Sequence, residues 1–338
     1  MSIHHDGDAQ LKEIDRFFPM KKGSIGDPDI YLGTKLRKVT LDNGVQAWGS
    51  SPAKYVQEAV SNCEKWISEN LGGRKLPKGT TSWPTGYAAE LDETPELTPQ
   101  LSSFYQSQVG VLHWIVEIGR VDVITEISHL ASNLALPREG HLEALIHVFG
   151  HLKRKYNSRL VFDPSYPEID KSQSIDHESK RFYGDVKEPV PDNAPKPRGK
   201  EVDTRLYVDS DHAGDKRIRR SRTGYFIFLN CALVIWRSAK QPTLETSVFG
   251  AEFVAMKNGM ERVRGLRYKL RMMGVPLAGP TYVFGDNMSV IHNTQRPEST
   301  LKKKSNSICY QYARESVAMS ESLTAHINTH ENPADLAT

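Results

Sequence analysis

Four acidic residues in the second half of the chain stand at the ends of apolar segments or inside a helical pattern, and they constrain the fold more than any other feature. Asp209 closes the segment RLYVD, and Asp286 ends the segment TYVFGD. Asp335 follows LTAHINT, whereas Glu252 lies inside a long helical pattern. Acids at the carboxyl ends of strands in a mixed sheet converge on one edge, where open α/β sheets bind ligands. Like charges gathered there repel one another unless a cation lies between them, so the pattern indicates a cation site.

The order of elements across residues 204–338 is that of an α/β domain. We expect three strands, a helix, a fourth strand, a helical region, a fifth strand and the start of a last helix. TGYFIFLN and CALVIWRS are the second and third strands, and the helix that carries Glu252 follows them. This order predicts a mixed five-stranded sheet with flanking helices.

A run of cations follows the first of these strands. Its members are Lys216, Arg217, Arg219, Arg220 and Arg222. Hydrolysis of a phosphodiester requires cations that hold the phosphates while metal ions address one of them. A solvated run of charge is the alternative interpretation, and the position next to Asp209 favours the functional one.

Residues 1–163 are expected to form one α+β region. Two strands flank an Asp-Asn-Gly turn at residues 42–44, which predicts a hairpin because Asn and Gly tolerate positive φ. Three helical patterns follow: the first begins at Ser51, the second includes residues 105–115 and the third includes residues 142–152.

Residues 164–203 are rich in Pro, Ser, Asp, Lys and Glu and contain few apolar side chains. We therefore expect a linker or a loose surface excursion between two domains, residues 1–163 and 204–338. A chain of 338 residues with 38% hydrophobic residues is long enough for both. The net charge of +3 neither demands nor excludes a polyanionic partner.

The cysteines and the amino terminus indicate an intracellular protein, cytoplasmic or nuclear. Cys63, Cys231 and Cys309 are far apart and odd in number, which suits a reducing compartment. The start MSIHHDGDAQ lacks the apolar region of a signal peptide, and no later run is long enough to span a membrane. We expect no membrane partner.

Taken together, these residues resemble the polyproteins of copia-type retrotransposons (Pseudoviridae) in their ribonuclease H domain. Four blocks carry the resemblance in the family's order: YVDSDHAGDKRIRRSRTGYFIF with D-x-A-G and S-x-x-G-Y, WRSAKQPTLETSVFGAEFVAM, DNMSVI and NPAD. The segments IYLG, VGVLHWIVEIGRVDV and GHLEALIHVFGHLKR look like the end of the family's reverse transcriptase. The resemblance implies a ribonuclease H-like fold at residues 204–338, preceded by the palm end, thumb and connection of a reverse transcriptase.

The resemblance also implies an activity, the hydrolysis of the RNA strand of RNA/DNA hybrids. Asp209, Glu252, Asp286 and Asp335 would bind two Mg²⁺ ions, which Mn²⁺ can replace, and Asp209 would bridge both. His330 would transfer a proton near Asp335. The run Lys216 to Arg222, together with Lys240, Gln241 and Asn287, would hold the nucleic acid, and the 2′-hydroxyl would distinguish RNA from DNA. The remainder of a retroelement polyprotein is a further expected partner.

The sequence departs from the family at several places. The tyrosine-x-Asp-Asp motif of the polymerase would lie upstream of Met1, so we expect no independent DNA synthesis. Gly250 stands where an acid is usual, residues 304–307 replace the block K-H-I-D, and most of a final helix is expected beyond Thr338. Two alternatives stay open: a decayed, non-catalytic remnant that at most binds nucleic acid, and a different nuclease on the same fold.

Overall fold

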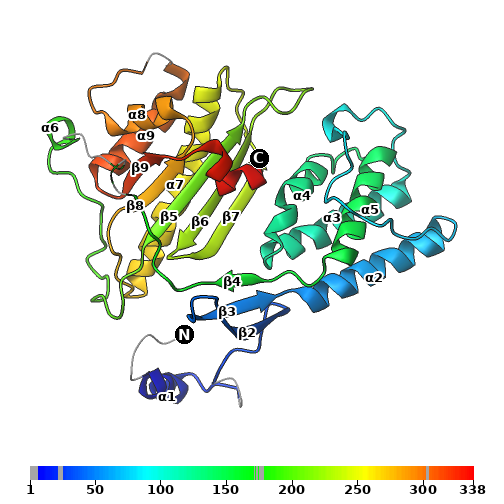
Figure 1. Ribbon diagram of the computed structural model, residues 1–338, viewed down its shortest axis with the longest axis horizontal. Coiled ribbons are helices and arrows are strands. Elements are labelled where there is room, and N and C mark those ends of the chain that lie inside the picture. The colour runs from blue at the N-terminus through cyan, green and yellow to red at the C-terminus, as the bar shows by residue number, and fades with distance from the viewer. Residues whose placement is uncertain (1–6, 22–25, 171, 173, 175–178, 302–303) are drawn as a thin grey trace.

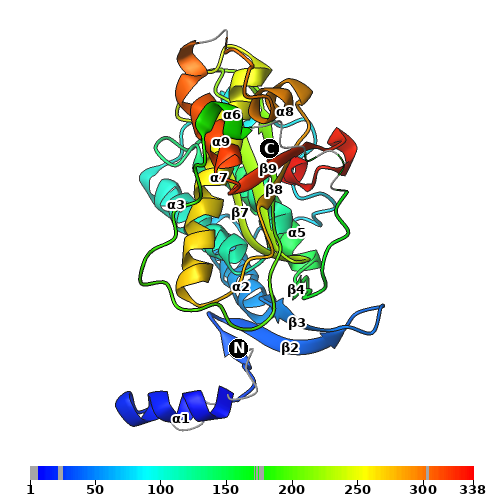
Figure 2. The same cartoon turned by 90° about the vertical axis from the view of Figure 1, so that its left-hand side faces the viewer.

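The computed structural model describes residues 7–21, 26–170, 172, 174, 179–301 and 304–338. Two sheets organise this part of the chain (Figure 1), one of four strands and one of five. The helix α1 (Gly7–Phe17) lies apart from both sheets in the two perpendicular views (Figures 1 and 2).

The four-stranded sheet is antiparallel throughout and has the order β1-β2-β3-β4. Its strands are β1 (Ile30–Tyr31), β2 (Thr34–Thr40), β3 (Gln46–Ser51) and β4 (Leu160–Phe162). The β2–β3 turn contains Gly44 at φ 81°, a conformation that glycine adopts without steric cost. The predicted hairpin is therefore confirmed.

All three helices predicted for the first half are present. They are α2 (Ala53–Asn70), α3 (Pro99–Glu117) and α5 (Glu139–Arg154), joined by the short turns η1 (Ala89–Leu91) and η2 (Val121–Val123). Helix α3 begins where Thr98 accepts a hydrogen bond from the Leu101 amide and proline occupies the first helical position. A fourth helix, α4 (Ile124–Ala131), was not predicted because eight residues give too short a periodic pattern.

The five-stranded sheet has the order β7-β6-β5-β8-β9. Its strands are β5 (Thr204–Asp211), β6 (Arg222–Leu229), β7 (Ala232–Lys240), β8 (Thr281–Gly285) and β9 (Ser322–His326). The first three strands pair antiparallel, and β8 and β9 continue the sheet in parallel with β5. The expected ribonuclease H-like mixed sheet is confirmed.

Helices cover the five-stranded sheet on both faces. On one face lie α7 (Val248–Met272), α8 (Met288–Gln295) and α9 (Ser307–Ala318), and Figure 2 shows α7 running alongside the strands. On the other face, Phe226 and Trp236 of β6 and β7 join the core of the first-half helices, so the two halves share one apolar core. Although α7 has 25 residues, neither it nor another helix in the described ranges has the length and apolar composition that crossing a membrane requires.

The chain closes over β5 and β6 with two 3₁₀ turns, η5 (Thr329–Glu331) and η6 (Pro333–Ala337). An α-helix was expected to start here. The turn η6 begins where Asn332 accepts a hydrogen bond from the Ala334 amide and Pro333 occupies the first position.

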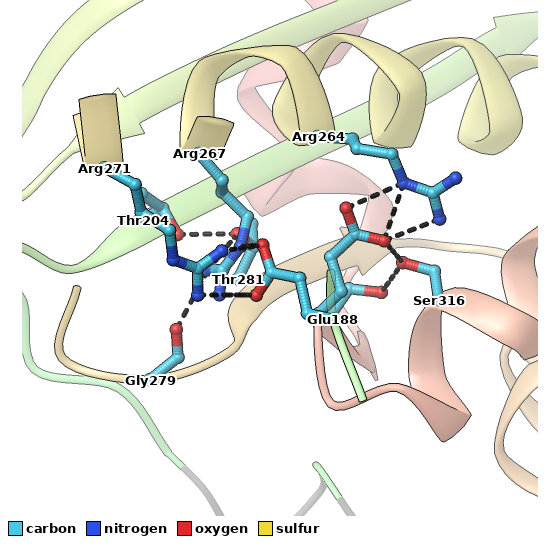
Figure 3. Close-up of polar contacts among 10 residues, drawn as sticks. Glu188, Thr204, Arg264, Arg267, Arg271, Gly279, Thr281 and Ser316 are labelled. Carbon is cyan, nitrogen blue, oxygen red and sulfur yellow. Dashed lines mark hydrogen bonds and ion pairs between the residues drawn. The ribbon is translucent and has the colours of Figure 1, made fainter. Parts of the chain in front are cut away.

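The segment between the halves contains α6 (Ser179–Tyr183) and is anchored to α7 by one carboxylate. Glu188 accepts hydrogen bonds from Arg267 Nε at 2.9 Å and from Arg271 Nη2 at 2.8 Å (Figure 3). Arg267 is only 2% exposed and also donates to the Gly279 carbonyl. Composition does not reveal this ion pair, because α7 lies far along the chain, and the division into two domains with a linker stays a prediction.

Candidate active site

Three of the four predicted acids meet at one edge of the five-stranded sheet. One carboxylate oxygen from each of Asp209, Glu252 and Asp286 lies within 4.8 Å of the other two. Because β5 and β8 are parallel neighbours, Asp209, near the end of β5, and Asp286, directly after β8, lie at the same edge. Ser247 accepts a hydrogen bond from the Gly250 amide and caps α7 there, which places Glu252 in the second turn of the helix.

Glu252 is the most buried member of this acid cluster, at 5% exposure. Ser210 Oγ donates to its Oε1 at 2.9 Å. Burial, with the charge of Asp209 as the next cause, raises the pKa of Glu252 to about 8. Burial also raises the pKa of Asp209, to which the charges of Asp335 and Asp286 add.

The acid cluster has no cationic side chain to neutralise it. Across the described ranges, none of its three carboxylates forms an ion pair. Three hard oxygen donors with unbalanced negative charge suit a hard divalent cation, which prefers carboxylate ligands. The donor set therefore fits a metal site, whereas a structural role would leave the repulsion uncompensated.

Asp286 is oriented by the segment that follows β9. Thr329 Oγ1 donates to Asp286 Oδ2 at 2.8 Å, and His326 Nε2 lies 3.1 Å from the Asp286 main-chain oxygen. Neither Thr329 nor His326 was predicted, because their relation to Asp286 depends on the register of two parallel strands.

Asn332 is a second positioning residue that the sequence analysis missed. Its buried Nδ2 donates to the Val208 carbonyl at 3.0 Å and ties η6 to β5, one residue before Asp209. An asparagine directly before proline is a typical start of a helical turn and could have marked this position.

Asp335 and His330 lie at the margin of the site. Asp335 is exposed on η6 and outside the group of three. Burial, with the charge of Asp286 as the next cause, raises the pKa of Asp335, and His330 acts in the opposite direction. His330 is itself exposed on η5, and its role in proton transfer stays a prediction.

The glycine of the S-x-x-G-Y block explains how η6 approaches the sheet. Gly224 pairs with Asp209 across β5 and β6. A Cβ at this position would lie 2.9 Å from the Ala334 carbonyl oxygen and 2.9 Å from Ala337 Cβ. Only glycine leaves room for η6 beside Asp209.

Four of the five cations in the predicted basic run are exposed at the same edge of the sheet. They are Lys216, Arg217, Arg219 and Arg220, in the loop between β5 and β6. Asp215 shapes the loop, since its Oδ1 accepts hydrogen bonds from the amides of Arg217 and Ile218. Their contact with phosphates stays a prediction.

Arg222 and Gln241 are buried and have partners within the protein. Arg222 is 5% exposed, donates to Ser128 Oγ and lies 3.3 Å from His129 Nδ1 on α4. Gln241 is 1% exposed, and its Nε2 donates at 3.0 Å to Thr223 Oγ1 and to a main-chain carbonyl of α7. The contact of both residues with nucleic acid stays a prediction.

Lys240 and Asn287 also have partners within the protein. Lys240 Nζ lies 2.5 Å from Asp215 Oδ2. The Asn287 side chain caps α8 by accepting hydrogen bonds from the Ser289 and Val290 amides. The contacts of Lys240 and Asn287 with nucleic acid stay predictions.

The two departures from the family pattern inside the second half touch each other. Asn306, in the turn η4 (Lys304–Asn306), is buried and donates through Nδ2 to Glu245 Oε2 at 2.9 Å. A Cβ at Gly250 would lie 2.5 Å from the same Glu245 oxygen. The glycine and the asparagine therefore form one packed unit with Glu245.

No protein-family model matches the chain. Among curated proteins it is similar to the retrovirus-related Pol polyproteins from transposon TNT 1-94 of Nicotiana tabacum, at 24% identity over 98% of the chain, and from transposon RE1 of Arabidopsis thaliana, at 23% identity over 69%. The chain spans 22% and 14% of the length of these two relatives. It is also 38% identical to secreted RxLR effector protein 161 of Plasmopara viticola, over 49% of the chain and 94% of that protein.

Solved structures similar to the chain fall into two groups. RNase H1 from Halobacterium salinarum matches 41% of the chain and is covered to 94%, at 12% identity with a TM-score of 0.30. LC11-RNase H1 in complex with an RNA/DNA hybrid matches 40% of the chain and is covered to 92%, at 16% identity with a TM-score of 0.31. The foamy viral protease-reverse transcriptase in complex with an RNA/DNA hybrid matches 98% of the chain and is covered to 59%, at 10% identity with a TM-score of 0.29.

Proposed function

The chain belongs to the Pol polyproteins of copia-type retrotransposons, in the region formed by the C-terminal part of the reverse transcriptase and a ribonuclease H-like domain, and on that premise we propose that it is an endonuclease for the RNA strand of RNA/DNA hybrids. One observation carries the proposal. Asp209, Glu252 and Asp286 share a site in which their charge is balanced by no side chain of the described residues.

Asp209, Glu252 and Asp286 would hold Mg²⁺, with Asp335 as a fourth ligand at the margin of a two-ion site. Bound Mg²⁺ lowers the pKa of water to form the nucleophile and stabilises the leaving 3′ oxygen. Asp209 lies within 4.8 Å of both other acids and would be the ligand shared by the two ions. Ser210 fixes the carboxylate of Glu252 and Thr329 fixes that of Asp286, so both would be oriented before substrate arrives.

Substrate binding would fall to the exposed cations at the same edge. Lys216, Arg217, Arg219 and Arg220 would contact phosphates of the hybrid, which positions it without reading its sequence. His330, on the turn before η6, would exchange a proton close to Asp335. The 2′-hydroxyl of the RNA strand is the group that distinguishes it from DNA.

A second candidate function is binding of hybrid without cleavage. Asp335 lies outside the tight group of three, and this observation favours a site with incomplete metal coordination. The packed unit of Gly250, Asn306 and Glu245 favours the catalytic alternative, because these departures from the family pattern fit together instead of disrupting the fold.

Cleavage of a fluorescent RNA/DNA hybrid by the purified chain in Mg²⁺ tests the proposal. We expect Asp286→Asn to reduce the rate by at least about a hundredfold, because one ligand of the site becomes neutral. The matched control is Asp192→Asn, an exposed acid of the segment between the halves. Duplex DNA and branched DNA serve as alternative substrates.

Equal rates for the parent chain and Asp286→Asn would refute the assignment. Binding of hybrid by a parent chain that never cuts it would establish the second candidate. Preferential cutting of branched or duplex DNA would identify a different nuclease on this fold.

A further inference from the structure

Two adjoining hollows open beside β7, the edge strand of the five-stranded sheet. Their volumes are about 460 and 290 Å³, and both are lined by Tyr225, Arg237 and Arg262. The larger also reaches Gln241 of the strand end, and the smaller reaches Glu117 of α3. We call the two hollows together the β7 groove.

The lining of the β7 groove has a net positive charge, because Arg237, Arg262 and Lys240 face two acids, Glu117 and Glu261. In the part of the chain that the structure describes, neither Arg237 nor Arg262 has a hydrogen-bond or ion-pair partner, and both are exposed. Glu261 lies 2.7 Å from Lys257 Nζ, whereas Glu117 forms no ion pair in the described ranges. Two guanidinium groups at one hollow are suited to bind phosphate, which matches their paired donors.

The groove also offers a buried acceptor. Gln241 is 1% exposed, its Nε2 is occupied by two acceptors, and its Oε1 has no hydrogen-bond partner. A buried oxygen without a donor is costly, so a ligand that supplies a hydroxyl would gain from meeting it. Phosphates next to hydroxyl groups are the pattern of an RNA backbone, so one RNA strand can serve both the arginines and this oxygen.

The β7 groove adjoins a third cavity at the basic loop. Lys240, at the end of β7, lines both the larger hollow and this cavity of about 270 Å³, which Arg217 and Arg220 also line. Arg237 lies three residues before Lys240, about 10 Å back along the strand and on the opposite face of the sheet. An extended ligand that contacts the basic loop would therefore cross the edge strand to reach Arg237.

We propose that the β7 groove binds the backbone of an RNA strand, with Arg237 and Arg262 donating to phosphates and Gln241 Oε1 accepting from a ribose hydroxyl. The choice of RNA as the ligand rests on the proposed function. The positive charge of the groove and the unpaired Gln241 oxygen are independent of that function. The groove would hold RNA outside the acid cluster and extend the contact beyond the cleaved bond.

The salt dependence of RNA binding tests the groove. The full chain carries Asp286→Asn, so that no cleavage occurs, and its affinity for a labelled single-stranded RNA is measured by fluorescence anisotropy over a series of KCl concentrations. In Arg237→Gln/Arg262→Gln, we expect the slope of log affinity against log salt to become shallower by about 1 per arginine. An RNA with 2′-deoxy substitutions should bind the parent chain more weakly.

The matched control removes two exposed cations at the opposite end of α7 through Arg198→Gln/Lys269→Gln. This variant should keep the parent slope, and thermal unfolding should show that both double variants are folded. Equal slopes for the groove variant and the control would overturn the proposal. Loss of binding to polyglutamate with unchanged binding to RNA would also overturn it and would identify an acidic peptide as the occupant.

A parallel cleavage assay separates this proposal from the proposed function. A parent chain that binds RNA through Arg237 and Arg262 but cuts no hybrid would refute the nuclease and leave the groove in place. A parent chain that cuts hybrid while the groove variant binds RNA as tightly as the control would refute the groove alone.

Discussion

Two groups of buried and half-buried acids lie towards opposite ends of α7, and only one of them is paired with cationic side chains in the described structure. At the start of the helix, Asp209, Glu252 and Asp286 gather without a cationic side chain in the described structure. Near its end, Glu188 is paired with Arg267 and Arg271 of α7 (Figure 3). Glu321 is paired with Arg264 of the same helix. Glu252 and Arg267 are fifteen residues apart, so about 22 Å of helix separates the two groups.

The arginine cluster, formed by Glu188, Glu321, Arg264, Arg267 and Arg271, shows how the chain satisfies buried charge when only the fold depends on it. Each carboxylate accepts hydrogen bonds at 2.6–2.9 Å from a guanidinium group. Ser316 Oγ also donates to Glu321. The carboxylates of the acid cluster accept hydrogen bonds from hydroxyl groups but have no cationic partner among the described residues. This arrangement suits a site that binds a cation.

Neutralising the acid cluster should abolish function and improve the fold. We expect Glu252→Gln to lower hybrid cleavage by about a thousandfold or more, because a metal ligand is lost. In EDTA at pH 8, the same variant should unfold at a higher temperature than the parent chain, because the parent either carries a buried charge beside Asp209 or keeps Glu252 protonated far above its ordinary pKa. Cleavage rates and calorimetry in EDTA provide the two measurements.

A Glu252→Gln chain that is less stable than the parent in EDTA would contradict this view of the acid cluster. Glu261→Gln is the control, since Glu261 lies on the exposed side of the same helix.

Removing one acid of the arginine cluster should have the opposite effect on stability and on cleavage. Glu188→Gln leaves the buried Arg267 without its counter-charge, and removing one partner of a buried ion pair costs about 3–5 kcal/mol. We expect a lower denaturation midpoint in urea, while cleavage by the folded fraction changes little. Glu201→Gln, an exposed acid of the same segment, should leave the midpoint unchanged. A midpoint equal to that of the parent would show that Glu188 does not anchor the segment.

The two clusters should also respond oppositely to pH. Since burial and then Asp209 raise the pKa of Glu252 from 4.5 to about 8, its stabilising protonation is complete below pH 4.5 and is lost as pH rises towards 8. Burial acts to raise the pKa of Glu188, but hydrogen bonds from Arg267 and Arg271 outweigh it and lower that pKa. The Glu188 contribution is therefore present above the ordinary pKa of glutamate and is lost in acid.

Thermal unfolding with EDTA or Mg²⁺ measures this difference. In EDTA, we expect the acid cluster to lower the unfolding temperature between pH 5 and 8, and Mg²⁺ to restore it most at pH 8, where the carboxylates are charged. Glu252→Gln should reduce the gain from Mg²⁺, and Glu188→Gln should keep it. A gain that is the same at pH 5 and pH 8 would argue against a metal at the acid cluster.

The strand ends that carry the acid cluster could be predicted from the sequence, whereas the contacts of the arginine cluster could not. The apolar alternation of β5 and β8 predicted where the strands end, and the ends placed Asp209 and Asp286 together. Periodicity is local, so it did not reveal that Glu188 pairs with Arg267, 79 positions further on, or that Arg222 is buried against α4. Each contact involves a buried arginine, a residue type that sequence analysis assigns to the surface by default.

The domain assignment was limited in the same way. Composition placed a boundary between residues 164 and 203, but composition reports only how many apolar side chains a segment contributes. Glu188 pairs with two arginines of α7, and main-chain hydrogen bonds from Glu188 to Met319 and from Arg198 to Gly274 also hold the segment, and composition reveals none of these contacts. The turn η6 was also unexpected as a 3₁₀ element, since its start depends on the local cap at Asn332.

The smallest expected effect concerns the margin of the acid cluster. Gly224→Ala would place a Cβ 2.9 Å from the Ala334 carbonyl oxygen, so η6 has to shift away from β6. We expect a loss of stability of about 1 kcal/mol, in the range of overpacking in a tight contact, and a several-fold loss of cleavage if Asp335 completes the site. Gly265→Ala is the control, because a Cβ there meets open space on an exposed helix face. Cleavage and unfolding curves measured on both variants distinguish the outcomes: lower stability with unchanged cleavage would place Asp335 outside the catalytic machinery and leave Asp209, Glu252 and Asp286 as the complete metal site.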